Sequence, residues 1–178
     1  MAYDSQLVAN YFIKKAQQEG KTLTPMQLQK LVYFAHGWYL ALFHAPLIRE
    51  NIEAWAWGPV VPSLYREFKR YGDQPIGEPA TVSRFTGTRL SLERPSLDEI
   101  ADPQEKERLR QFLDRIWLVY SPYTAAQLSN MTHAANSPWQ IALEQNQGAR
   151  STVINNELIQ QYFEAERDAN QAEAEAAG

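Results

Sequence analysis

Residues 23–43 read LTPMQLQKLVYFAHGWYLALF, and this segment predicts the element around which the rest of the chain is organised. Thr24 is a favourable helix N-cap, Pro25 suits the first helical position, and Gln27 lies three residues after the cap. Apolar residues then recur at intervals of three and four and extend round most of the cylinder. A helix that is apolar on most sides is buried, so we expect a long central helix from Pro25.

The same start signals recur on both sides of this helix. A cap residue, a proline or an acid in the first turn, and an apolar stripe at helical spacing together predict each of the other helices. They are expected over 5–18, over 103–120, from Thr124, from Pro138 to near Gly148, and from Asn155 with a docked face that ends at Phe163.

Between residues 49 and 95 the helical pattern is interrupted. Residues 51–57 alternate as a strand does, and Gly58-Pro59 predicts a turn before a short helix. Residues 81–85 and 88–92 are expected to form a hairpin around Thr86-Gly87. The fold class is therefore mainly α with a small β element (α+β): a compact helical bundle around a long central apolar helix, with a short strand or hairpin insertion.

The length of the chain and the distribution of its charge predict one domain followed by an acidic tail. The chain has 178 residues, no cysteine and a formal net charge of −4. Residues 164–178 hold five acids and one base, so they carry that whole net charge and residues 1–163 sum to zero. We expect a single domain over 1–163 and an acidic, frayed or disordered tail over 164–178, because the tail has no apolar stripe to dock.

Several classes of partner are not expected. The amino-terminal residues lack the basic start and the uniformly apolar run of a signal peptide, and no apolar run is long enough for a membrane span. A body with balanced charge has no field that gathers nucleic acid. A cytoplasmic protein that binds neither membrane nor nucleic acid is the expectation.

Catalytic chemistry is not expected either. The histidines are His36, His44 and His133, and the first two lie eight residues apart, a spacing that does not share a helix face. The chain has no nucleophile elbow, no cysteine nucleophile and no glycine-rich phosphate loop. We therefore predict no enzyme, no metal and no cofactor. His133 is expected at a helix end, where it bonds free backbone carbonyls while Trp139 packs across the corner. A role in binding is the alternative.

The aromatic residues of the predicted strand are the candidate for function. Trp55 and Trp57 lie two residues apart, so a strand places both rings on one face. Either a helix or a partner covers them; the stiff Gly58-Pro59 and Pro62 add weight to a partner, because less entropy is lost on binding. The candidate partner-binding residues are Trp55, Trp57, Pro59, Tyr65, Arg66 and Lys69.

The order of these motifs resembles a known family. Residues 26–42, followed by Pro46-Leu47, residues 52–55, residues 58–65 and later Thr132-His133 with residues 137–139, resemble the Panacea domain, also called the SocA-like antitoxin domain, over about residues 5 to 163. The resemblance implies a non-enzymatic antitoxin of a bacterial or prophage toxin–antitoxin pair. Such a protein inhibits a cognate toxin by direct protein contact.

Two alternatives stay open. In the first alternative, the chain is a proteolytic adaptor or a phage anti-defence effector that acts through its acidic tail. The tail would deliver a bound partner to a protease or imitate nucleic acid. The spare aromatic surface also fits a contact between two copies of the chain.

Overall fold

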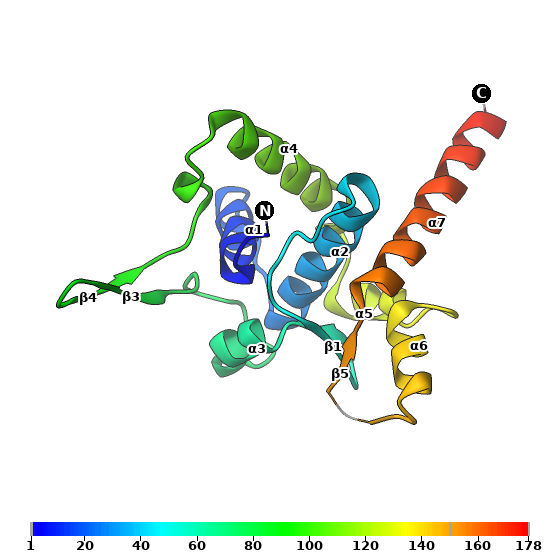
Figure 1. Cartoon of the computed structure of the whole chain (residues 1–178), viewed down its shortest axis with the longest axis horizontal. Coiled ribbons are helices and arrows are strands. Elements are labelled where there is room, and N and C mark those ends of the chain that lie inside the picture. The colour runs from blue at the N-terminus through cyan, green and yellow to red at the C-terminus, as the bar shows by residue number, and fades with distance from the viewer. Residues whose placement is uncertain (1, 150, 178) are drawn as a thin grey trace.

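The computed structural model describes residues 2–149 and 151–177, and it places one long helix at the centre of the chain (Figure 1). This helix, α2 (Pro25–Phe43), begins at Thr24, whose hydroxyl accepts from the Gln27 amide while the Gln27 side chain accepts from the Thr24 amide. The other α-helices are α1 (Ser5–Gln18), α3 (Pro62–Phe68), α4 (Pro103–Tyr120), α5 (Ala125–Thr132), α6 (Pro138–Gln145) and α7 (Asn156–Ala176). The predicted α+β, mainly helical fold is confirmed.

Aromatic packing holds α2 between its neighbours. The ring of Phe34 stacks on Tyr120 of α4, with centroids 4.2 Å apart, and meets Phe163 of α7 edge to face. Gly37 lies directly under Phe163, so closely that a β-carbon there would overlap the ring. Because α7 packs this tightly, residues far apart in the sequence form one core with α2.

Two small antiparallel sheets complete the fold. The first has the order β2-β1-β5, built from β1 (Ile52–Trp55), β2 (Gly58–Val60) and β5 (Thr152–Ile154). The second is the hairpin of β3 (Val82–Thr86) and β4 (Arg89–Glu93), close to the predicted position. Sequence pattern does not predict β5, because three residues are too few to show an alternation.

The strand predicted over 51–57 is wrong at its carboxyl end. The chain turns at Ala56-Trp57, and Gly58 returns as the first residue of β2, with Trp55 opposite Gly58 in the register. A φ of 104° at Gly58 makes this reversal accessible to glycine and strained for other residues. Trp55 and Trp57 therefore do not lie on one strand face.

The acidic tail is helical where we expected fraying or disorder. Alanine, glutamate and glutamine favour helix and prolong α7 from the part that is already docked. Phe163 is its last buried residue, and the Arg167 guanidinium still donates to the Ala41 carbonyl at 2.9 Å. Beyond this bond the helix points away from the body (Figure 1).

The division into a domain over 1–163 and a tail over 164–178 stays a prediction. Met1, Arg150 and Gly178, which fall in those ranges, lie outside the described residues. Within the part of the chain that the structure describes, no helix is long and apolar enough to cross a bilayer.

Candidate functional site

The hairpin of β1 and β2 is fastened to the body through its backbone carbonyls. The indole nitrogen of Trp139 donates to the carbonyl oxygen of Trp55 at 2.7 Å, and the Ser129 hydroxyl donates to that of Trp57 at 2.9 Å. The ammonium nitrogen of Lys30 donates to the carbonyl oxygen of Pro59 at 3.0 Å. Helices α6, α5 and α2 thus each hold one point of the hairpin.

A glutamine continues this fastening beyond β2. The side-chain amide of Gln29 donates to the carbonyl oxygen of Val61, and its oxygen accepts from the Val61 amide at 2.9 Å. These two hydrogen bonds have the pattern of a backbone pair in a β-ladder, although one partner is a side chain of α2. It fixes the chain between β2 and α3 at the point where the short helix begins.

Lys30 is an unusual anchor because its side chain is buried in the core. Only 1% of the residue is exposed. Burial disfavours the ammonium form, so desolvation lowers the pKa of Lys30 to about 7, far below the ordinary lysine value. A neutral amine can still donate to the Pro59 carbonyl, so the bond does not require the charge.

Gly58 is where the hairpin comes closest to these anchors. A β-carbon at this residue would lie 2.6 Å from both the Lys30 nitrogen and the Thr132 hydroxyl. The absence of a side chain therefore brings the hairpin backbone against α2 and α5. Glycine meets two requirements here, the positive φ and the close approach.

His133 and Trp139 form the corner next to the hairpin. Their rings stack with centroids 4.0 Å apart, which confirms the packing of Trp139 across this corner that the sequence predicts. Desolvation, with a smaller contribution from nearby Lys30, lowers the pKa of His133. The buried Nε2 of His133 makes no hydrogen bond within the described residues, so the expected bonding of helix-end carbonyls does not occur through this atom.

The structure brings together part of the predicted partner-binding set. The Trp55 and Tyr65 rings meet edge to face with centroids 4.8 Å apart, and the Trp55 indole nitrogen donates to the Glu53 carboxylate. Arg66 and Lys69 are exposed on α3 and just after it. The structure thus shows contact between the two rings, and it places the two cations one and four residues after Tyr65 in the chain.

Trp57 and Pro59 lie differently from what the sequence predicts. Trp57 occupies the hairpin turn and is 71% exposed, although its carbonyl is held by Ser129. Pro59 is buried, because its carbonyl faces Lys30 in the interior, and so it cannot contact a partner. We define the aromatic patch as the remaining five residues: Trp55, Trp57, Tyr65, Arg66 and Lys69.

The arrangement suits binding by an apolar surface. The patch presents rings and cations, and an open pocket of about 630 Å³ adjoins Trp55, lined also by Ala54, Ala56 and Leu143. Rings on a rigid support provide the apolar anchors from which protein interfaces draw most of their affinity.

The histidines lie in separate settings. His36 is buried, accepts from the Ile48 amide and bonds the Asn156 side chain, whereas His44 is exposed beside Glu164. Among the described residues, no group of three or more His, Asp or Glu side chains is placed to hold a metal ion.

The anchors of the hairpin were not predicted from sequence, although a signal for them exists. Gln29 and Lys30 are polar residues on a helix that is otherwise apolar from Leu28 to Ala35. A polar side chain on a buried face needs a bonding partner, and that requirement points to a nearby backbone segment. Nothing in the sequence indicates which segment it is.

Comparison with known proteins places the hairpin in a matched region. The chain matches the family model for "Antitoxin SocA-like, Panacea domain" over residues 28–140. It is 31% identical over 138 residues to Antitoxin SocA of Caulobacter vibrioides (strain NA1000 / CB15N), an alignment that covers 78% of this chain and 69% of that protein. No solved structure matches the chain. The range 28–140 contains the hairpin, α3 and all four anchoring side chains.

Burial of Lys30 predicts a stability that rises with pH. The unfolded chain keeps its lysine protonated up to about pH 10.4, whereas folded Lys30 loses its proton near pH 7. Between these values the unfolded state binds the extra proton, so the free energy of unfolding should rise by up to about 1.4 kcal/mol per pH unit. Urea denaturation between pH 7 and 9 measures this slope.

Lys30→Met should flatten that slope, because the residue then carries no titrating group. The matched control is Lys69→Met, which removes an exposed lysine and should leave the slope of the natural protein intact. Parallel pH curves for the natural protein and Lys30→Met would show that folded Lys30 keeps an ordinary pKa.

Proposed function

The chain belongs to the Antitoxin SocA-like, Panacea domain family, and on that premise we propose that it is the antitoxin of a bacterial or prophage toxin–antitoxin pair. It neutralises a cognate toxin in the cytoplasm by direct protein contact, without catalysing a reaction. The aromatic patch is the contact surface. The observation that carries this assignment is the exposed Trp57 ring, on a hairpin whose backbone is bonded to α2, α5 and α6.

The energetics of association support the choice of this surface. A partner that binds a mobile loop must first order it, and that entropy is subtracted from the affinity. Here the backbone of the hairpin is already bonded to α2, α5 and α6, so little ordering remains. Tryptophan, tyrosine and arginine are also the residue types over-represented among interface residues with large energetic effects.

The charge of the patch indicates the surface it fits. Arg66 and Lys69 follow Tyr65 by one and four residues and are exposed. A toxin surface with an apolar pocket and acidic residues at its rim would complement them and would associate faster at low salt.

Removal of the patch should abolish neutralisation. We expect the triple variant Trp57→Ala/Tyr65→Ala/Arg66→Ala to bind the toxin at least about a hundredfold more weakly, because that loss corresponds to about 2.7 kcal/mol and three interface residues of these types can account for it. Growth rescue of cells that express the cognate toxin, together with calorimetric titration, measures the effect.

The matched control for this experiment is Leu118→Ala. Leu118 is 70% exposed on α4, nearly the same exposure as Trp57, but it lies outside the patch. This variant should rescue growth as the natural protein does. Full rescue by a triple variant that retains the natural circular dichroism spectrum would place the toxin elsewhere on the molecule.

A second candidate function has one structural feature in its favour. The last turns of α7 are an exposed helix that carries Asp168, Glu173 and Glu175 beyond its last bond to the body. An adaptor that hands a bound toxin to a protease, or an anti-defence effector, would use such a projecting acidic element. The proposal of direct inhibition does not need it.

Deletion of residues 169–178 separates the two functions. The deletion leaves Arg167 and its bond to α2 in place, so the body should stay folded. Direct inhibition predicts unchanged toxin affinity and unchanged growth rescue. If the deletion variant binds the toxin with unchanged affinity but no longer rescues growth, the protection belongs to the tail.

A further inference from the structure

The β3–β4 hairpin carries an apolar face that no other described part of the chain covers. Phe85 and Leu90 lie opposite each other in the register, and Leu92 follows Leu90 on the same face. Their exposed fractions are 77%, 54% and 72%. The hairpin projects from the body, away from α7 (Figure 1). Large apolar side chains gathered this way mark a contact surface.

The root of this hairpin is fixed to the body by one buried residue. The side-chain amide of Asn10 on α1 donates to the carbonyl oxygens of Ala80 and Pro95, both at 3.0 Å. Its oxygen accepts from the Ala80 amide at 2.7 Å. Asn10 therefore holds the segments that enter and leave the hairpin, so its direction is set although its strands are exposed.

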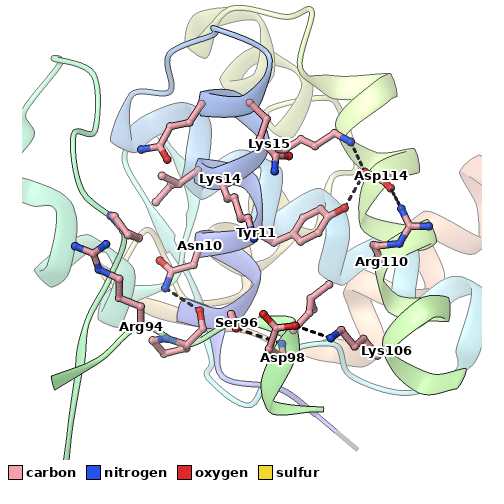
Figure 2. Close-up of a pocket in the computed structure, with 16 residues that line it drawn as sticks. Asn10, Tyr11, Lys14, Lys15, Arg94, Ser96, Asp98, Lys106, Arg110 and Asp114 are labelled. Atoms are coloured by element: carbon pink, nitrogen blue, oxygen red, sulfur yellow. Dashed lines mark hydrogen bonds and ion pairs between the residues drawn. The ribbon is translucent and has the colours of Figure 1, made fainter. Parts of the chain in front are cut away.

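A groove of about 470 Å³ lies at this root, between α1, the legs of the hairpin and α4 (Figure 2). Five basic and two acidic side chains line it, a net charge of +3 in a chain whose net charge is −4. The charged lining residues are Lys14, Lys15, Arg94, Lys106, Arg110, Asp98 and Asp114. Concave surfaces lined by one sign of charge concentrate the field and attract the opposite charge.

Four of the five groove cations already form ion pairs, including Arg94 with Glu78 at 2.7 Å and Arg110 with Glu107 at 2.6 Å. Asp114 accepts from Lys15 at 2.7 Å and from Arg110 at 2.9 Å, while Asp98 pairs with Lys106. Lys14 is exposed and forms no ion pair with any acid in the described ranges. An anionic ligand would therefore find a cation available without breaking a bond.

We propose that the apolar face of the β3–β4 hairpin and the groove at its root form one docking site for an acidic amphipathic segment of a partner protein. The two parts are continuous along the chain, because Leu90 and Leu92 lie on one face of β4 and Arg94, the first residue after β4, lines the groove. The apolar side of the segment covers the hairpin, and its carboxylates lie over the groove.

Area and charge argue against a second copy of this chain as the occupant. The three apolar side chains expose roughly 400 Å² together, about half of the ~800 Å² per partner in a standard interface. In a symmetric contact the same surface meets itself, so two surfaces of like net charge would be brought together. An acidic segment avoids that repulsion and supplies the missing area inside the groove.

This site is separate from the aromatic patch, and it does not depend on the proposed antitoxin function. No residue of the patch lines the groove or lies on the β3–β4 hairpin.

The test uses a defined peptide probe and the full chain. The probe is a fluorescein-labelled helical peptide of about 16 residues, with leucines at helical spacing and glutamates elsewhere; its counterpart has lysine at every glutamate. Fluorescence anisotropy should show binding of the acidic peptide at least about tenfold tighter than of the basic one. High salt should weaken binding of the acidic peptide.

Two pairs of substitutions locate the binding. Phe85→Ser/Leu92→Ser removes the apolar face and Lys14→Glu/Arg94→Glu reverses charge in the groove, and each should weaken binding about tenfold or more. All four residues are exposed, so the variants should fold. Leu118→Ser and Arg115→Glu make the same kinds of change on exposed positions of α4 outside the groove, and they should bind as the natural protein does.

Several results would overturn the proposal. Equal binding of the acidic and basic peptides would remove the role of charge, and unchanged binding by either double variant would remove that half of the site. A natural protein that sediments as a dimer, with Phe85→Ser/Leu92→Ser monomeric, would assign the hairpin face to self-association. Trp57→Ala/Tyr65→Ala should bind the peptide normally, so this outcome is independent of the test of the aromatic patch.

Discussion

The architecture of the proposed toxin-binding surface depends on one hydrogen bond in a dry interior, between the Lys30 side chain and the Pro59 carbonyl. A lysine without water around it needs an acceptor, and a carbonyl that faces the core needs a donor, so each group satisfies the other. The contact forms only because Gly58 leaves room for the Lys30 nitrogen. Loss of either group would leave a buried polar atom without a partner, at a cost of about 1–3 kcal/mol.

The rest of the site extends from that bond. The hairpin backbone is bonded to the body of the protein, and the side chain of Trp57, in the turn, is exposed. The second hairpin, β3–β4, is held differently, by the buried Asn10 at its root and by an exposed ion pair between Arg84 and Glu99. The molecule thus exposes apolar side chains on two hairpins, at Trp57 in the β1–β2 turn and along β3–β4, and these are the two surfaces proposed to bind partners.

Helix starts could be predicted from sequence because their signals are local: a cap, a proline and an apolar stripe within one turn of each other, as at Thr24 and Pro25. The β1–β2 turn could not, since Ala56-Trp57 is not a pair typical of two-residue turns. The burial of Pro59 and the roles of Gln29 and Lys30 depend on contacts between distant segments. Trp55 and Tyr65 were predicted together because strand and helix are adjacent in the chain.

The claim that the β1–β2 hairpin is rigid is tested most directly by hydrogen exchange of its backbone amides. Such exchange reports the free energy of local opening. The amide of Val61, which donates to Gln29, and those of β1 and β2 should exchange as slowly as the amides of α2. The amides of β3 and β4 should exchange at least about a hundredfold faster. Equal, fast exchange in both hairpins would contradict a preformed surface on β1–β2.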